Sequence, residues 1–101
     1  MSKKEENFYK SGNKKFDEGD YQGAIDDYSK AIELDPENPE IYISRALCKK
    51  FSKDYKGAID DSTKAIELDP ENPARYITRA YSKSYLEDIK VQLMISQKQL
   101  N

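Results

Sequence analysis

The chain has 101 residues, of which 36% are charged and 37% hydrophobic, and its formal net charge is −2. This length allows one domain at most, and the interspersed charges form no basic stripe of the kind that binds nucleic acid. No apolar run is long enough to span a membrane and the first residues lack the apolar core of a signal peptide, so we expect a cytoplasmic protein.

The residue types that most often carry catalysis and metal binding are scarce. Histidine is absent and Cys48 is the only cysteine, which excludes histidine-assisted nucleophiles and a disulfide within the chain. The four glycines are scattered and form no phosphate-binding loop. Adjacent acidic pairs such as Asp60 and Asp61 fit solvated helix faces better than metal ligands. We therefore predict a protein that is not an enzyme and holds neither metal nor cofactor.

The first predicted helix covers residues 3–18. Ser2 followed by Glu5 forms a capping-box pattern at its start. Phe8, Gly12 and Phe16 recur on one face at helical spacing. A Gly-Asp pair at 19–20 ends the helix, because glycine readily adopts the left-handed conformation of a helix stop.

A second helix is predicted at 21–35, with Asp20 as its N-cap and an apolar stripe along one side. Pro36 cannot continue this helix. Asn38 and Pro39 suit the N-cap and the first position of a third helix, at 39–52. The sequence thus predicts a tight connection between two antiparallel helices.

A fourth helix, at 55–69, repeats the second almost letter for letter. The block AIDDYSKAIELDPENP at 24–39 returns as AIDDSTKAIELDPENP at 58–73, and only Tyr28/Ser62 and Ser29/Thr63 differ. A period of 34 residues predicts stacked copies of one helical unit. Lys53 stands where the first copy has its turn glycine, so we expect this lysine to adopt a glycine-like, slightly strained backbone.

Asn72 and Pro73 cap a fifth predicted helix that starts with Ala74, but after about Tyr85 the repeat fails. Two interpretations remain. A sixth helix could turn back near residues 86–88, or the fifth helix could continue to the end of the chain. The absence of glycine and proline from 74 to 101 favours the continuous helix.

These units resemble the tetratricopeptide repeat, whose pattern combines an aromatic residue, a small residue, a Gly-Asp-Tyr turn, two alanines and a proline. The matching residues are Phe8, Gly12, Gly19-Asp20-Tyr21, Ala24, Ala31 and Pro36 in the first copy, Tyr42, Ala46, Asp54-Tyr55, Ala58, Ala65 and Pro70 in the second, and only Tyr76 and Ala80 in the third. The resemblance implies an all-α protein of antiparallel helix pairs stacked as a short right-handed α-solenoid. It divides a single domain, 1–101, into repeats at 5–38 and 39–72 and a partial third repeat with an irregular C-terminal helix at 73–101.

The resemblance also implies a concave groove, lined by the first helix of each pair, that holds an extended peptide or a partner helix. Seven of its ten groove positions are aromatic or aliphatic, and such an apolar stripe marks an interaction surface. These positions are Tyr9, Asn13, Ile43, Ser44, Leu47, Phe51, Ile77, Thr78, Tyr81 and Tyr85. The primary hypothesis is therefore a protein–protein adaptor. In the other interpretation, the stripe is covered by the chain's own C-terminal helix or by a second copy.

Some members of the family clamp the C-terminal carboxylate of a heat-shock chaperone with lysine, asparagine and arginine side chains. The corresponding positions here are Tyr9, Asn13, Ser44, Ala74 and Thr78, and only Asn13 matches. Without the fixed cations, the charge-assisted bonds to a carboxylate are missing. We do not expect such a clamp unless Arg75 or Arg79 substitutes.

Self-association is the alternative function. Repeat arrays usually need at least three units and a polar cap, whereas this chain has two complete units and an apolar last segment. A two-fold dimer formed by the C-terminal helices would bury that segment. The candidate contacts are Leu86, Ile89, Leu93, Met94 and Leu100.

Overall fold

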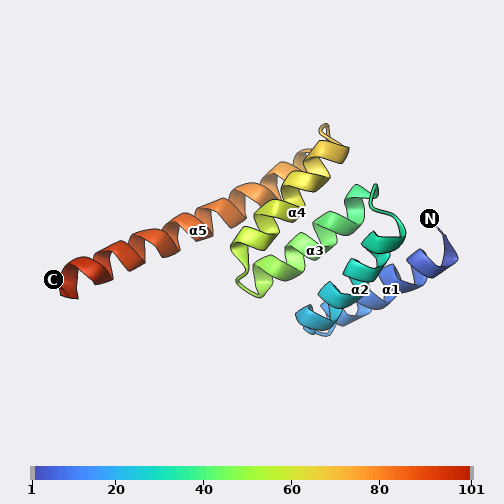
Figure 1. The fold of residues 1–101 in the computed structure, drawn as a ribbon, viewed down its shortest axis with the longest axis horizontal. Helices are drawn as coiled ribbons and strands as arrows, with labels where there is room; N and C mark the ends of the chain where they lie inside the picture. Colours follow the sequence, from blue (N-terminus) through green and yellow to red (C-terminus); the bar gives the residue numbers. More distant parts are fainter. Residues whose placement is uncertain (1, 101) are drawn as a thin grey trace.

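The computed structural model describes residues 2–100, and over that range the regular elements are five α-helices (Figure 1). They are α1 (Lys3–Asp17), α2 (Tyr21–Leu34), α3 (Pro39–Phe51), α4 (Tyr55–Leu68) and α5 (Pro73–Leu100). α1 packs on α2, α3 on α4, and α2 on α3, so consecutive helix pairs stack side by side. The predicted all-α architecture is confirmed, and each of the first four helices ends one residue earlier than predicted.

The capping residues act as the sequence predicts. The Ser2 hydroxyl accepts a hydrogen bond from the Glu5 amide at 3.2 Å, and the Glu5 carboxylate accepts one from the Ser2 amide at 3.4 Å. Asp20 and Asp54 each accept a bond, at 3.0 Å, from the amide three residues later. Side chains therefore satisfy backbone donors at the start of α1, α2 and α4.

The turns within the two complete pairs share one backbone conformation despite different sequences. Gly19 has a φ of 82° and Lys53 a φ of 69°, both in the left-handed region. In both turns the amide of the following aspartate donates to a carbonyl five residues earlier, at 2.8 Å. The prediction for Lys53 is confirmed, and its left-handed backbone costs about 1–2 kcal/mol relative to glycine.

The core lies between α1, α2 and α3. Its fully buried members are Ala24, Tyr28, Ala31, Ile41 and Cys48. The alanines allow close approach of the helices, and aromatic rings of α1 fill the remaining space around Tyr28. None of the helices among the described residues is both long and apolar enough to cross a membrane.

The interface between α4 and α5 is more polar. Arg75 and Ser82 are buried where Ile41 and Cys48 stand 34 residues earlier. Arg75 forms ion pairs with Glu40 at 2.8 Å and with Asp69 at 3.1 Å. The third unit is therefore held by ion pairs as well as by packing.

α5 is continuous over 28 residues, so the interpretation with a sixth helix is wrong. Its first half packs on α4, and its second half projects from the body of the molecule (Figure 1). By the 34-residue period, Glu87 corresponds to Gly19 and Lys53, the two turn residues with a left-handed backbone. Glu87 instead lies within α5. Gln92 replaces the fully buried Ala24 and Ala58, and its bulk would prevent the close contact that a returning helix needs.

Candidate protein-binding groove

The predicted groove residues lie on α1, α3 and α5, the first helices of the three units. Their spacing within each helix brings most of them to one side of the stack. Thr78 differs, because only 8% of its surface is exposed and its hydroxyl donates to the Ala74 carbonyl at 3.3 Å. It contributes little open surface to a partner.

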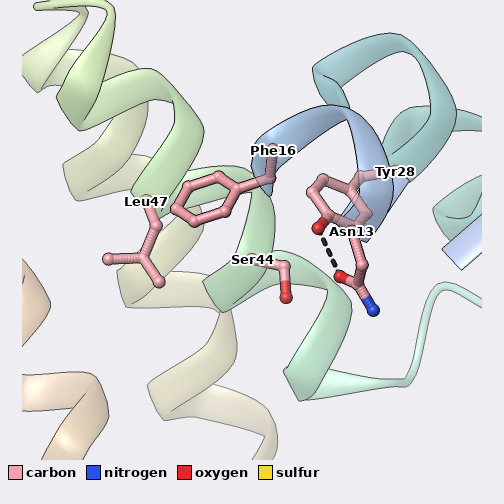
Figure 2. A pocket seen from close by; sticks show the side chains of 5 residues that line it. All are labelled: Asn13, Phe16, Tyr28, Ser44 and Leu47. Carbon is pink, nitrogen blue, oxygen red and sulfur yellow. Dashed lines mark hydrogen bonds between the residues drawn. The ribbon is translucent and has the colours of Figure 1, made fainter. Parts of the chain in front are cut away.

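A small, partly open cavity of about 140 Å³ lies between α1, α2 and α3 (Figure 2). It is lined by Asn13, Phe16, Tyr28, Ser44 and Leu47. Three of these five residues are predicted groove positions, and the phenyl ring of Phe16 lies between Leu47 and Tyr28 in the figure. The structure thus brings the predicted polar and apolar positions of two repeats to one cavity.

Tyr28 forms the polar wall of this cavity together with Asn13. The Tyr28 hydroxyl donates a hydrogen bond to Asn13 Oδ1 (Figure 2). Burial raises the pKa of Tyr28 far above its usual value, so the phenol stays protonated and remains a donor. Tyr9 packs its ring 5.8 Å from that of Tyr28, and these contacts fix the amide of Asn13 at the rim.

Phe16 and Tyr28 also line the cavity, although neither is among the groove positions predicted from the sequence. Phe16 is half-buried and Tyr28 is almost fully buried, yet both reach the cavity. The usable signal was that Tyr28 is one of the two positions at which the repeated blocks differ.

A second, wider hollow of about 400 Å³ lies along α5. It is lined by Ile77, Ala80, Tyr81 and Ser84. Ile77 and Tyr81, two predicted groove positions, are more than half exposed. The Lys50 ammonium group of α3 lies 5.5 Å from the centre of the Tyr81 ring and links the two helices across the groove.

The remaining aromatic positions gather at the turn between α3 and α4. Phe51 stacks on Tyr21 with ring centres 5.5 Å apart, and Tyr85 stacks on Tyr55 at 5.2 Å. Phe51 and Tyr85 face a further hollow of about 250 Å³ together with Lys53. These two predicted residues therefore lie at one hollow, and the Phe51 ring also lies 5.8 Å from the ring of Phe16, which lines the cavity at Asn13.

The arginines near the groove are already engaged. Arg75 is buried in its ion pairs with Glu40 and Asp69. Arg45 donates two bonds to Asp61, at 2.7 and 2.8 Å. The Arg79 guanidinium lies 5.5 Å from the centre of the Tyr76 ring on the same helix. Arg75 is therefore not available as a substitute for a clamp cation.

The comparisons with known proteins agree with this geometry. Profiles described as "TPR repeat" and "Tetratricopeptide repeat" match residues 12–48 and 39–72. No curated protein sequence matches the chain. A solved structure of the first TPR of Spaghetti (RPAP3) bound to HSP90 peptide SRMEEVD is 30% identical, with a TM-score of 0.83, and the match covers 89% of this chain and 71% of that one.

Two further structures are similar. The TPR2B domain of yeast Sti1 in complex with an Hsp70 peptide is 29% identical, with a TM-score of 0.82 over 92% of this chain and 74% of that one. The second TPR domain of human RPAP3, in complex with HSP70 peptide SGPTIEEVD, is 28% identical, with a TM-score of 0.76 over 85% and 75% of the two chains.

The stacked helix pairs and the superposition on these structures define a right-handed α-solenoid of the protein-binding class. The chain belongs to the tetratricopeptide repeat family.

Proposed function

We propose that the chain is a protein–protein adaptor, acting in the cytoplasm and without enzymatic activity, that binds a peptide or a helix in its concave groove. The single observation that carries this proposal is the exposed apolar surface of α5 around Ile77 and Tyr81, which Lys50 of α3 contacts at the Tyr81 ring. Similar structures that hold chaperone peptides support a peptide-binding role.

The groove favours an apolar ligand over a carboxylate. Asn13 is the only residue that matches the carboxylate clamp, and the amide NH2 group with which it could donate to a carboxylate carries no charge, so a charge-assisted bond is missing. Leu47 and Tyr81 instead offer apolar surface on neighbouring helices. An amphipathic helix with apolar side chains at positions i, i+3, i+4 and i+7 fits such a surface.

Leu47→Asp combined with Tyr81→Asp should weaken binding of an amphipathic helical peptide at least about tenfold, because each carboxylate would lose hydration against the ligand. Fluorescence anisotropy with a panel of labelled amphipathic peptides measures the loss. Asn7→Asp combined with Gln99→Asp is the matched control, since it adds the same charge at exposed positions outside the groove. Equal affinity in the two double variants would contradict the proposal. Tighter binding of SRMEEVD than of every amphipathic peptide would favour a carboxylate ligand instead.

We also propose self-association through the C-terminal half of α5, as a second function. The observation that favours it is the exposure of several large apolar residues on one unsupported helix. They are Ile89, Val91, Leu93, Met94 and Ile95. The side chain of Leu100, a predicted contact, lies outside the described residues.

Light scattering should give twice the chain mass of 11.7 kDa at micromolar concentration, and deleting residues 87–101 should restore the mass of one chain. A mass that stays near 11.7 kDa as concentration rises would exclude self-association. The circular dichroism of the shortened chain is the control that α1 to α4 remain folded.

A further inference from the structure

One face of α3 holds the helix that follows it. The guanidinium of Arg45 and the ammonium group of Lys49 both bind the Asp61 carboxylate of α4, at 2.7 and 3.0 Å. Beside these basic side chains, Ala46 has no exposed surface, and Tyr42, one turn earlier, is only 8% exposed. An aromatic residue, an arginine, an alanine and a lysine therefore share the side of α3 that binds Asp61 of α4.

The first half of α5 carries the same four residue types at the same spacing, but no helix among residues 2–100 follows it (Figure 1). The 34-residue period places them at Tyr76, Arg79, Ala80 and Lys83. Tyr76 is 40% exposed, and Ala80 and Lys83 are exposed as well. The Tyr76 hydroxyl donates to the carbonyl six residues earlier at 2.8 Å, as the Tyr42 hydroxyl does at 3.0 Å. This tyrosine is therefore held in the same way on both helices, but on α5 the face around it is uncovered.

The two basic side chains of this face lack the carboxylate that their counterparts bind. Among residues 2–100, no ion pair includes Arg79 or Lys83. Arg79 contacts the Tyr76 ring, but Arg45 keeps the equivalent ring contact, at 5.9 Å, while it binds Asp61. The ring contact thus leaves the N–H groups of Arg79 able to donate to a carboxylate.

The chain itself does not supply this carboxylate. On the side of α4 that reaches α3, the buried residues are Ala58, Asp61 and Ala65. One period later the chain has Gln92, Ile95 and Gln99, which lie on the exposed second half of α5. A second folded copy does not offer the α4 pattern either, because the alanines of both α2 and α4 are fully buried.

We infer that this face of α5 is a second binding surface, which takes a helix of another protein with the pattern Ala-x-x-Asp-x-x-x-Ala. The aspartate binds Arg79 and Lys83, as Asp61 binds their counterparts, and the alanines allow the helix to approach Ala80 closely. The surface lies beside the proposed groove and does not depend on it. Ala80 borders the hollow along α5, but neither basic residue lines any of the three hollows.

The first experiment uses a synthetic peptide of residues 54–69, which carries the α4 pattern. A lactam between the side chains of Lys56 and Asp60, which are exposed and one turn apart, favours its helical form. Fluorescence anisotropy with the full chain should show saturable binding. Asp61→Asn in the peptide should weaken binding at least about tenfold, because its charge-assisted bonds are lost.

The matched control peptide carries Glu67→Gln, which also removes one negative charge but at an exposed position. Its affinity should stay within about twofold of the parent peptide. Equal losses for the two peptides would overturn the inference, as would the absence of saturable binding up to about 1 mM.

The second experiment changes the protein. Arg79→Glu combined with Lys83→Glu should weaken binding of the parent peptide at least about tenfold. A peptide with Asp61→Arg should bind this variant better than the natural chain, because the charges are exchanged. Lys4→Glu combined with Lys64→Glu is the matched control, since it makes the same charge change at exposed positions outside α5. Circular dichroism checks that both variants remain folded.

The outcomes separate this surface from other sites on the chain. Binding that depends on Arg79 and Lys83, and not on Leu47, supports the second surface whether or not the groove binds amphipathic peptides. Loss of binding with Leu47→Asp but not with the α5 variant would place the peptide in the groove and overturn the inference, while the proposed adaptor function stands. Dependence on Arg45 alone would mean that the peptide replaces α4, which also overturns it.

Discussion

Replacing Asp61 with alanine should destabilise the protein by about 3–5 kcal/mol, the range for removing one partner of a buried ion pair. Asp61 binds the Arg45 guanidinium through both carboxylate oxygens, at 2.7 and 2.8 Å, and the Lys49 ammonium at 3.0 Å. The Asp61 side chain is 7% exposed and that of Arg45 19%. Without the carboxylate, the guanidinium stays largely buried and has no charged partner.

Urea unfolding followed by circular dichroism measures this loss, which is a large part of the stability of a domain of this size. Asp60→Ala is the matched control on the same helix, because Asp60 is exposed and its replacement should change stability by less than about 0.5 kcal/mol. A loss for Asp61→Ala no greater than that for Asp60→Ala would contradict the prediction.

The first repeat offers a graded comparison at the same position. Asp27 corresponds to Asp61, but its partners are the Ser11 hydroxyl at 2.6 Å and Lys15, which is more exposed than Arg45. Burial alone would raise the pKa of Asp27, but the hydrogen bonds from Ser11 and Lys15 outweigh burial and lower it. Since no buried cation depends on Asp27, Asp27→Ala should be less destabilising than Asp61→Ala.

The Asp61 network also bears on the proposed groove. Arg45 extends from α3 to Asp61 of α4 and to Ser29 of α2, whose hydroxyl accepts a bond at 3.1 Å. It therefore joins three helices at one point. Ser44 and Leu47 flank Arg45 in sequence on α3, so the network holds the helix that presents them to the cavity.

The parts of the fold that local chemistry determines could be predicted from the sequence. Caps at Ser2, Asp20 and Asn38 depend on neighbouring residues only, and all three were predicted and confirmed. The sequence did not decide whether the last helix turns back or continues, because a turn at Glu87 depends on whether the residues after it could pack on α5 as a returning helix. Lys53 shows that this chain tolerates a left-handed turn without glycine, so the missing glycine did not settle the question.

The groove was harder to predict because exposure depends on how the units stack. The resemblance places both Ser44 and Thr78 at the groove, but only Ser44 lines the cavity, whereas Thr78 is buried. The buried Arg75 was also unexpected at a position equivalent to an isoleucine. Its partners, Glu40 and Asp69, lie on other elements, and no local pattern connects them.

The main difference between the two repeated blocks is that Tyr28 of the first corresponds to Ser62 of the second. In the first repeat Tyr28 packs on Gly12, and in the second Ser62 corresponds to Tyr28 and Ala46 to Gly12. A Cβ atom at Gly12 would lie 2.7 Å from the Tyr28 ring, closer than carbon atoms can approach. Positions 12 and 28 are therefore coupled: a tyrosine at 28 requires glycine at 12.

A double-mutant cycle tests this pairing. Gly12→Ala alone should destabilise by about 1–3 kcal/mol through overpacking, despite the better helix propensity of alanine. Tyr28→Ser alone should cost about 3–5 kcal/mol, as for other large losses of aromatic volume. With Tyr28→Ser present, Gly12→Ala should become neutral or stabilising, because the ring it meets is gone, which gives a coupling energy of about 1–3 kcal/mol.

The second repeat supplies the control, since it already has the small residue at position 62. Ala46→Gly there should cost only the helix propensity of alanine over glycine and the contact of one methyl group, about 1–2 kcal/mol. Additive effects of Gly12→Ala and Tyr28→Ser in urea unfolding would contradict the pairing. Since the Tyr28 hydroxyl also fixes Asn13 at the cavity, the doubly substituted protein should fold but bind groove ligands more weakly. The ring that forces glycine at position 12 would then serve both packing and recognition.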